Sequence, residues 1–116
     1  MNKLKIIIFL LIITLNLAAQ NQGNIWYFGD GIGLDFNQNP PALLTNGKMI
    51  TNEGCSSIAD ENGNLLLYTD GIKVWNKNHQ VMLNGTGLFG HRSSTQSAII
   101  IPNLRKKNKY YIITAD

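Results

Sequence analysis

Residues 60–75 read DENGNLLLYTDGIKVW, and this stretch decides the fold class. Two apolar, β-favouring runs, 65–69 and 72–75, are separated by Asp70-Gly71, and Asn62-Gly63 precedes the first run. Asn-Gly and Asp-Gly steps favour the tight turns of β-hairpins. The three leucines at 65–67 place apolar side chains on both faces of their strand, so that strand must be covered on both sides. The stretch therefore predicts paired strands within stacked sheets.

The same alternation of short apolar runs and turn clusters continues in both directions along the chain. Further strands are expected at 24–29, 32–36, 55–59, 80–83, 96–101 and 109–114, with weaker ones at 42–44 and 49–50. Residues 84–92 are expected to form a Gly-rich loop. No segment after Gln20 has the apolar period of a helix. About nine short strands predict an all-β fold, namely a partial β-propeller of about two blades, with a small β-sandwich as the alternative.

The first 19 residues predict a cleaved signal peptide. Lys3 and Lys5 form a positive head, the apolar run 6–19 follows, and the run ends in small residues before a polar stretch. As a helix this run would reach about 21 Å, which is short of the roughly 30 Å core of a bilayer. We expect cleavage after residue 19 or 20, no membrane span afterwards, and a secreted or cell-surface protein.

Charge and cysteine content exclude several classes of function. The chain carries 10 Lys and Arg against 7 Asp and Glu, a net charge of +3. Loss of Lys3 and Lys5 with the leader would leave +1, so nucleic acid is not an expected partner. One Cys, Cys55, provides neither a disulfide framework nor a cysteine zinc site.

Several motifs, taken in order, resemble the N-terminal region of large secreted Bacteroidetes proteins. These are the aromatic opening NIWYFGDG, followed by DENGN, YTDG, VWN, NGTG and SSTQS, and together they extend from residue 24 to 116. Proteins of that kind resemble β-propellers at this end. Many of them continue into PKD-type domains and a gliding-motility-associated C-terminal domain, which the type IX secretion system recognises. The resemblance implies a fold and a cellular address, and no particular chemistry.

The length of the chain bears on the propeller prediction. A blade takes about 40–45 residues, and closure of a propeller usually needs at least about four blades. The roughly 97 residues from Gln20 onward would make about two blades. We therefore expect residues 20–116 to be a truncated N-terminal segment of a propeller, which needs missing blades or another chain to close it.

The acidic and amide residues that stand in turns are expected to be structural. Asp60, Asn62 and Gly63 form one hairpin turn, and Asp70 with Gly71 forms another, because Asx side chains bond nearby backbone groups there. The spacing of residues 60–71 does not match a calcium loop. His79 and His91 have no metal-ligand spacing. No catalytic, cofactor-binding or metal-binding residue is predicted.

Aromatic and basic side chains are the remaining candidates for recognition. Trp75 and Phe89 are possible contacts for a glycan or a protein partner, although aromatic residues more often pack in β cores. Four basic residues in five, Arg105, Lys106, Lys107 and Lys109, predict a solvated hairpin tip, with an anionic polymer as a lesser alternative.

These features predict an exported, non-enzymatic β module of a cell-surface or secreted protein with a structural or adhesion-type role. The alternatives are a fragment of a sialidase- or lactonase-like propeller hydrolase and a truncated product without autonomous function. The sequence lacks the repeated acidic and arginine residues that a propeller hydrolase needs, which disfavours the first of these alternatives.

Overall fold

The computed structural model describes residues 20–115, and this part of the chain is all-β, which confirms the predicted class. The predicted signal peptide lies outside the described residues. One 3-10 turn, η1 (Asn21–Gly23), precedes the strands. The nine strands are β1 (Ile25–Phe28), β2 (Ile32–Asp35), β3 (Ala42–Leu44), β4 (Ser56–Ala59), β5 (Leu65–Thr69), β6 (Lys73–Asn76), β7 (Val81–Thr86), β8 (Ala98–Pro102) and β9 (Tyr110–Thr114).

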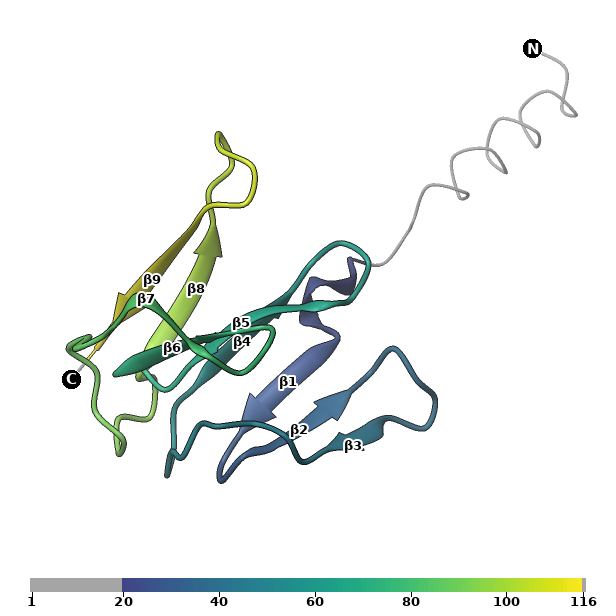
Figure 1. The fold of residues 1–116 in the computed structure, drawn as a ribbon, viewed down its shortest axis with the longest axis horizontal. Coiled ribbons are helices and arrows are strands. Elements are labelled where there is room, and N and C mark those ends of the chain that lie inside the picture. Colours follow the sequence, from purple (N-terminus) through teal and green to yellow (C-terminus); the bar gives the residue numbers. More distant parts are fainter. Residues whose placement is uncertain (1–19, 116) are drawn as a thin grey trace, which may run out of the picture.

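The strands form three antiparallel sheets, and in each sheet neighbours in the chain are neighbours in space (Figure 1). The first sheet has the order β1-β2-β3, the second β4-β5-β6-β7, and the third is the β8-β9 hairpin. A four-stranded meander like the second sheet is the form of a propeller blade. None of the three sheets closes on itself. The architecture is therefore consistent with a partial propeller and with a small sandwich.

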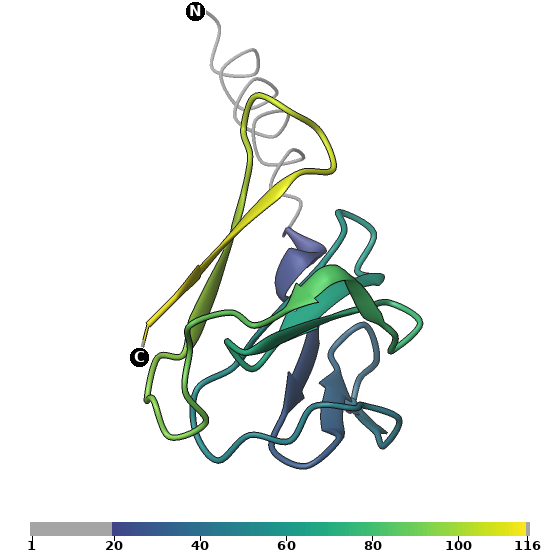
Figure 2. The same cartoon turned by 60° about the vertical axis from the view of Figure 1, so that its left-hand side comes forward.

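The second sheet is the middle layer of the stack. On one face, Tyr68 and Trp75 pack with Ile25 and Tyr27 of the first sheet in one buried cluster. On the other face, Ile58, Leu67 and Val74 form a second buried cluster. Side chains of the hairpin, including Ile100, Tyr110 and Ile112, pack against that second cluster. The first sheet and the hairpin thus lie on opposite sides of the middle sheet, as Figures 1 and 2 show. Because the middle sheet is covered on both sides, β5 carries three successive leucines, and Leu67 is one of those buried under the hairpin.

Polar side chains of the middle sheet fix its position against the first sheet. Ser57 Oγ donates to the carbonyl of Ile25 at 2.9 Å and accepts from the backbone N–H of Tyr27 at 3.3 Å. The Cys55 thiol donates to the carbonyl of Tyr27 at 3.4 Å. Small side chains on β4 can therefore approach the edge of β1 and satisfy its backbone groups.

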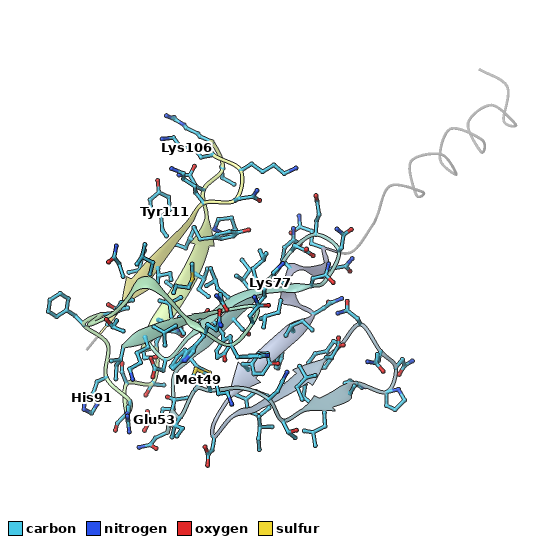
Figure 3. The ribbon with its side chains drawn as sticks, in the orientation of Figure 1. Met49, Glu53, Lys77, His91, Lys106 and Tyr111 are labelled. Carbon is cyan, nitrogen blue, oxygen red and sulfur yellow. The ribbon has the colours of Figure 1, made fainter. Side chains whose placement is uncertain are left out.

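Most strand boundaries differ from the predicted ones by one or two residues, and three differences have a clear physical reason. β7 continues to Thr86, because Thr86 pairs with Lys73 where a loop was expected. Residues 49 and 50 do not form a strand, since Ile50 makes only one isolated bridge, with Asp30, while the Met49 side chain is buried in the first cluster. Figure 3 shows Met49 in the middle of the molecule. Pro102 was expected to lie just after its strand and to stop it. In the structure it is the last residue of β8 and pairs with Tyr110.

Candidate interaction surfaces

The first sheet exposes an apolar face on the side away from the middle sheet. Strand register places Trp26, Leu34 and Leu43 in one row across the three strands, with Phe28 beside Ile32 in the next row. Trp26 is 51% exposed and Leu43 66%. The Trp26 ring packs on Phe36, with ring centroids 4.9 Å apart. We call this surface the first-sheet face, made of Trp26, Phe28, Ile32, Leu34, Phe36 and Leu43.

The β8-β9 hairpin exposes a second apolar face. Ile99 pairs with Ile113, and Ile101 pairs with Tyr111, so these four side chains share one side of the hairpin. Each of the four is 40% exposed or more. Their neighbours in the chain point to the other side and cover the middle sheet. We call Ile99, Ile101, Tyr111 and Ile113 the hairpin face. Both faces of this hairpin are apolar, and the described part of the chain covers only one.

Trp75 and Phe89, the two predicted contact residues, have opposite environments. Trp75 is 6% exposed, and its ring stacks on Tyr68 with centroids 5.4 Å apart and an interplanar angle of 10°. A sugar or protein partner has no free ring face to contact there, so the burial of Trp75 argues against a role in recognition. Phe89 is 88% exposed in the loop after β7. Other exposed aromatic side chains are those of Trp26, Phe28 and Phe36 on the first-sheet face and Tyr111 on the hairpin face.

Asp60 closes the turn between β4 and β5 through its own backbone neighbours. Its Oδ1 accepts from the N–H groups of Asn62 and Asn64, each at 2.9 Å. These hydrogen bonds favour the ionised form and hold the pKa of the Asp60 carboxyl below its ordinary value. Gly63 has a φ of +83°, the left-handed conformation that glycine adopts without strain. The carboxylate therefore stabilises the turn, as the sequence predicted.

Asp70 plays the same part between β5 and β6, but in a buried position. Its Oδ1 accepts from the N–H groups of Ile72 at 2.8 Å and Lys73 at 2.7 Å. The side chain is 4% exposed. Gly71, with a φ of +84°, lies so close to Ser97 that a Cβ at Gly71 would be 2.6 Å from the Ser97 carbonyl oxygen. The turn thereby joins the middle sheet to the segment that enters the hairpin.

A polar cluster that sequence reasoning missed joins the first and middle sheets. Tyr27 Oη donates to Asn46 Oδ1 at 2.7 Å, and Asn46 Nδ2 lies 2.9 Å from His79 Nε2. His79 Nδ1 lies 3.1 Å from Tyr68 Oη, which also accepts from the N–H of Lys48 at 3.1 Å. The rings of Tyr27 and Tyr68 stack with centroids 4.7 Å apart. We call Tyr27, Asn46, Tyr68 and His79 the tyrosine–histidine cluster.

The tyrosine–histidine cluster favours a neutral imidazole. Burial lowers the pKa of His79 below its ordinary value of 6.5, and the positive charge of Lys48 lowers it further. An amide N–H of Asn46 directed at Nε2 needs that nitrogen unprotonated, which leaves Nδ1–H to donate to Tyr68. Burial also raises the pKa values of Tyr27 and Tyr68. The cluster is therefore uncharged near neutral pH, and its hydrogen bonds connect the first sheet to the middle sheet.

The lone thiol and the possibility of a metal site were both considered. Burial raises the pKa of the Cys55 thiol, and the nearby Asp70 raises it further, so Cys55 is poorly disposed to ionise. Within residues 20–115, no three His, Cys, Asp or Glu side chains gather closely enough to hold a metal ion. The same part of the chain contains no helix with the length and apolar character needed to cross a membrane.

Fold and surfaces together define a small all-β module of three stacked antiparallel sheets with an apolar face at each end of the stack. No protein family, curated protein or solved structure matches the chain in the comparisons made.

Proposed function

We propose that this chain is an exported, non-enzymatic β module that contributes apolar sheet faces to a larger assembly at the cell surface or outside the cell. The first-sheet face and the hairpin face carry this proposal. Contiguous exposed apolar patches on a soluble protein usually mark interaction sites. An isolated two-stranded hairpin is at best marginally stable in water, and within the described residues the hairpin has apolar cover on one side only.

The ionisable groups support a structural role over a catalytic one. Asp60 and Asp70 are bonded to the backbone of their own turns, and His79 is bonded between two sheets. A catalytic pair needs two such groups directed at one reacting position. The leader-like sequence of residues 1–19 supports export, and the resemblance to secreted Bacteroidetes proteins supports a surface location.

Expression of the full chain in a Gram-negative host tests export. We expect the mature N-terminus at residue 20 or 21, measured by intact mass, and protein in the periplasm or medium. A control variant, Ile8→Asp with Leu11→Asp, places charges in the apolar run and should retain the leader and the protein in the cytoplasm. An uncleaved wild-type protein inside the cell would contradict export.

Activity and binding assays test the rest of the proposal. We expect no turnover of model glycosides or lactones, and specific hydrolysis by the purified protein would contradict the non-enzymatic role. On a glycan or protein array, binding through the first-sheet face should be lost in Trp26→Ala. Leu83→Ala, at a residue 93% exposed outside both faces, is the control, and Phe89→Ala tests the other predicted contact residue separately.

A further inference from the structure

The chain between β3 and β4 contains a segment that is bonded to the first sheet and packs against the middle sheet. We call residues 45–51 the strap. The N–H of Gly31 in the β1–β2 turn donates to the carbonyl of Met49 at 2.9 Å, and the N–H of Gly47 donates to the carbonyl of Gly31 at 3.1 Å. The Met49 side chain is 1% exposed and lies in the first buried cluster. The strap is therefore anchored on the first sheet and carries a core residue across to the middle sheet.

Two polar contacts join the strap to the middle sheet. The Lys48 N–H donates to Tyr68 Oη at 3.1 Å, and Asn46 Nδ2 lies 2.9 Å from His79 Nε2. His79 belongs to the β6–β7 turn, where its N–H donates to the carbonyl of Asn76 at 2.9 Å and its φ is +59°. Because this turn is bonded within itself, the imidazole keeps its place on the middle sheet when the strap loses contact.

A proton on His79 is incompatible with the contact that Asn46 makes. The Asn46 amide donates to Nε2, while its Oδ1 accepts from Tyr27 Oη at 2.7 Å. An imidazolium carries a proton on both ring nitrogens, so it presents a donor where the amide needs an acceptor. Turning the amide would bring Oδ1 to the imidazolium and take it away from the Tyr27 hydroxyl. One hydrogen bond of the tyrosine–histidine cluster is therefore lost in either case.

The titratable groups around the imidazole come from β1, from β5 and from the strap. They are Tyr27, Tyr68 and Lys48. Burial raises the pKa values of both tyrosines, so their phenols are neutral. Burial lowers the pKa of His79, and the charge on the strap lowers it further. Lys77, on the same turn as His79, acts on Asp60 and lowers the pKa of that carboxyl. A proton on His79 is thus opposed by burial and repelled by the strap.

We propose that the strap is an acid-released latch: protonation of His79 frees residues 45–51 from the middle sheet and exposes Met49. This inference is independent of the proposed function. The released imidazole has its ordinary pKa of 6.5, above that of the latched state, so the released state binds more protons as the pH falls. Between pH 7.5 and 5.5 the ratio of released to latched protein should therefore rise by up to about tenfold.

Other contacts between the two sheets do not depend on a histidine. Ser57 Oγ donates to the carbonyl of Ile25 at 2.9 Å, and Asn37 Nδ2 donates to the carbonyl of Gly63 at 2.8 Å. Hydroxyl and amide groups do not change charge between about pH 5 and 8. These bonds persist when His79 is protonated, so we expect the release to be confined to the strap.

The test compares the oxidation of two methionines by hydrogen peroxide at pH 7.5 and pH 5.5, with peptide mass spectrometry as the readout. Met49 is 1% exposed and Met82 is 40% exposed, and neither thioether titrates, so Met82 is the internal control. The initial rate at Met49 relative to Met82 should rise about three- to tenfold at the lower pH. A ratio that is the same at both pH values would overturn the latch.

Hydrogen exchange distinguishes release of the strap from unfolding of the whole protein. The Lys48 amide, which is bonded to Tyr68 Oη, should be less protected than the amides of β5 at both pH values. Its protection should also fall between pH 7.5 and 5.5, after correction for the intrinsic exchange rate. Equal protection of Lys48 and of β5 would show that the strap opens only when the whole protein unfolds, which would overturn a local release.

Three variants assign the effect to its groups. His79→Gln removes the titrating group, so its ratio of Met49 to Met82 oxidation should be the same at both pH values. Asn46→Ala removes the strap's partner for His79 and should raise Met49 oxidation several-fold already at pH 7.5. His91→Gln, at an exposed histidine, is the matched control and should behave like the wild type. A pH dependence that survives in His79→Gln would overturn the proposal, as would wild-type protection of Met49 in Asn46→Ala. If His79→Gln loses its far-ultraviolet circular dichroism, Asn46→Ala decides alone.

Discussion

At the scale of single residues, His79 links stability to pH. Its pKa is lowered in the folded protein by burial and by Lys48, whereas in the unfolded chain it returns to the ordinary value of 6.5. The unfolded state then binds more protons in this range, so the contribution is fully present above pH 6.5 and is lost as the pH falls below it. We expect the free energy of unfolding, measured by denaturant titration, to decrease between pH 7.5 and 5.5.

Substitutions identify the group that is responsible. His79→Gln should flatten the pH dependence, because it removes the titrating imidazole between Tyr68 and Asn46. His91→Gln is the matched control, since the His91 side chain is exposed and bonds only the nearby N–H of Ser93. If the pH dependence of the unfolding free energy persists in His79→Gln and disappears in His91→Gln, the effect belongs to His91 and this account is wrong. Asp60 should affect stability only at more acidic pH, because the ordinary pKa of its carboxyl is 3.8 and the turn lowers this pKa further.

At the scale of elements, the β5–β6 turn depends on glycine. Gly71 has a φ of +84°, and an added Cβ would lie 2.6 Å from the backbone oxygen of Ser97, which is completely buried. We expect Gly71→Ala to lower the free energy of unfolding by about 1–3 kcal/mol, through backbone strain and the clash. Gly23→Ala is the control, because a Cβ there meets no atom within 4 Å. Equal stabilities of the two variants in thermal unfolding would contradict this account.

The elements that could be predicted from sequence are those set by local chemistry. The strand at 65–69 and the turns at Asp60 and Asp70 follow from apolar runs and Asx-Gly steps, and the structure has them at those residues. The tyrosine–histidine cluster could not be predicted in this way. Tyr27 and Asn46 are 19 residues apart and Asn46 and His79 are 33 apart, so only the packing of two sheets brings them together.

The sequence also does not predict which side of β1 forms the first-sheet face. Alternation along β1 indicates two different sides of the strand, yet it does not say which aromatic side is covered. The structure buries Tyr27 and exposes Trp26, whereas Trp75 on β6 is buried against Tyr68. A tryptophan favours both cores and binding surfaces, so residue type alone does not distinguish the two outcomes.

At the scale of the whole molecule, the stack depends on its middle layer. Leu67 is 7% exposed and lies in the cluster between the middle sheet and the hairpin. We expect Leu67→Ala to lower the free energy of unfolding by about 2–5 kcal/mol, because a cavity forms under the hairpin. Leu83→Ala, at a residue 93% exposed, should change it by no more than about 0.5 kcal/mol. Similar losses of unfolding free energy in both variants would mean that the hairpin does not cover this side of the middle sheet.

The layered arrangement also predicts the order of local opening. The middle sheet is covered on both faces, whereas the hairpin has one exposed face and pairs only with itself. Regions with fewer buried apolar contacts open at a lower cost in free energy. In native-state hydrogen exchange at low protein concentration, amides of β5 and β6 should therefore be the most protected, and amides of β8 and β9 should exchange faster. Hairpin amides as slow as those of β5 at that concentration would show that the hairpin is held by more than its contact with the middle sheet.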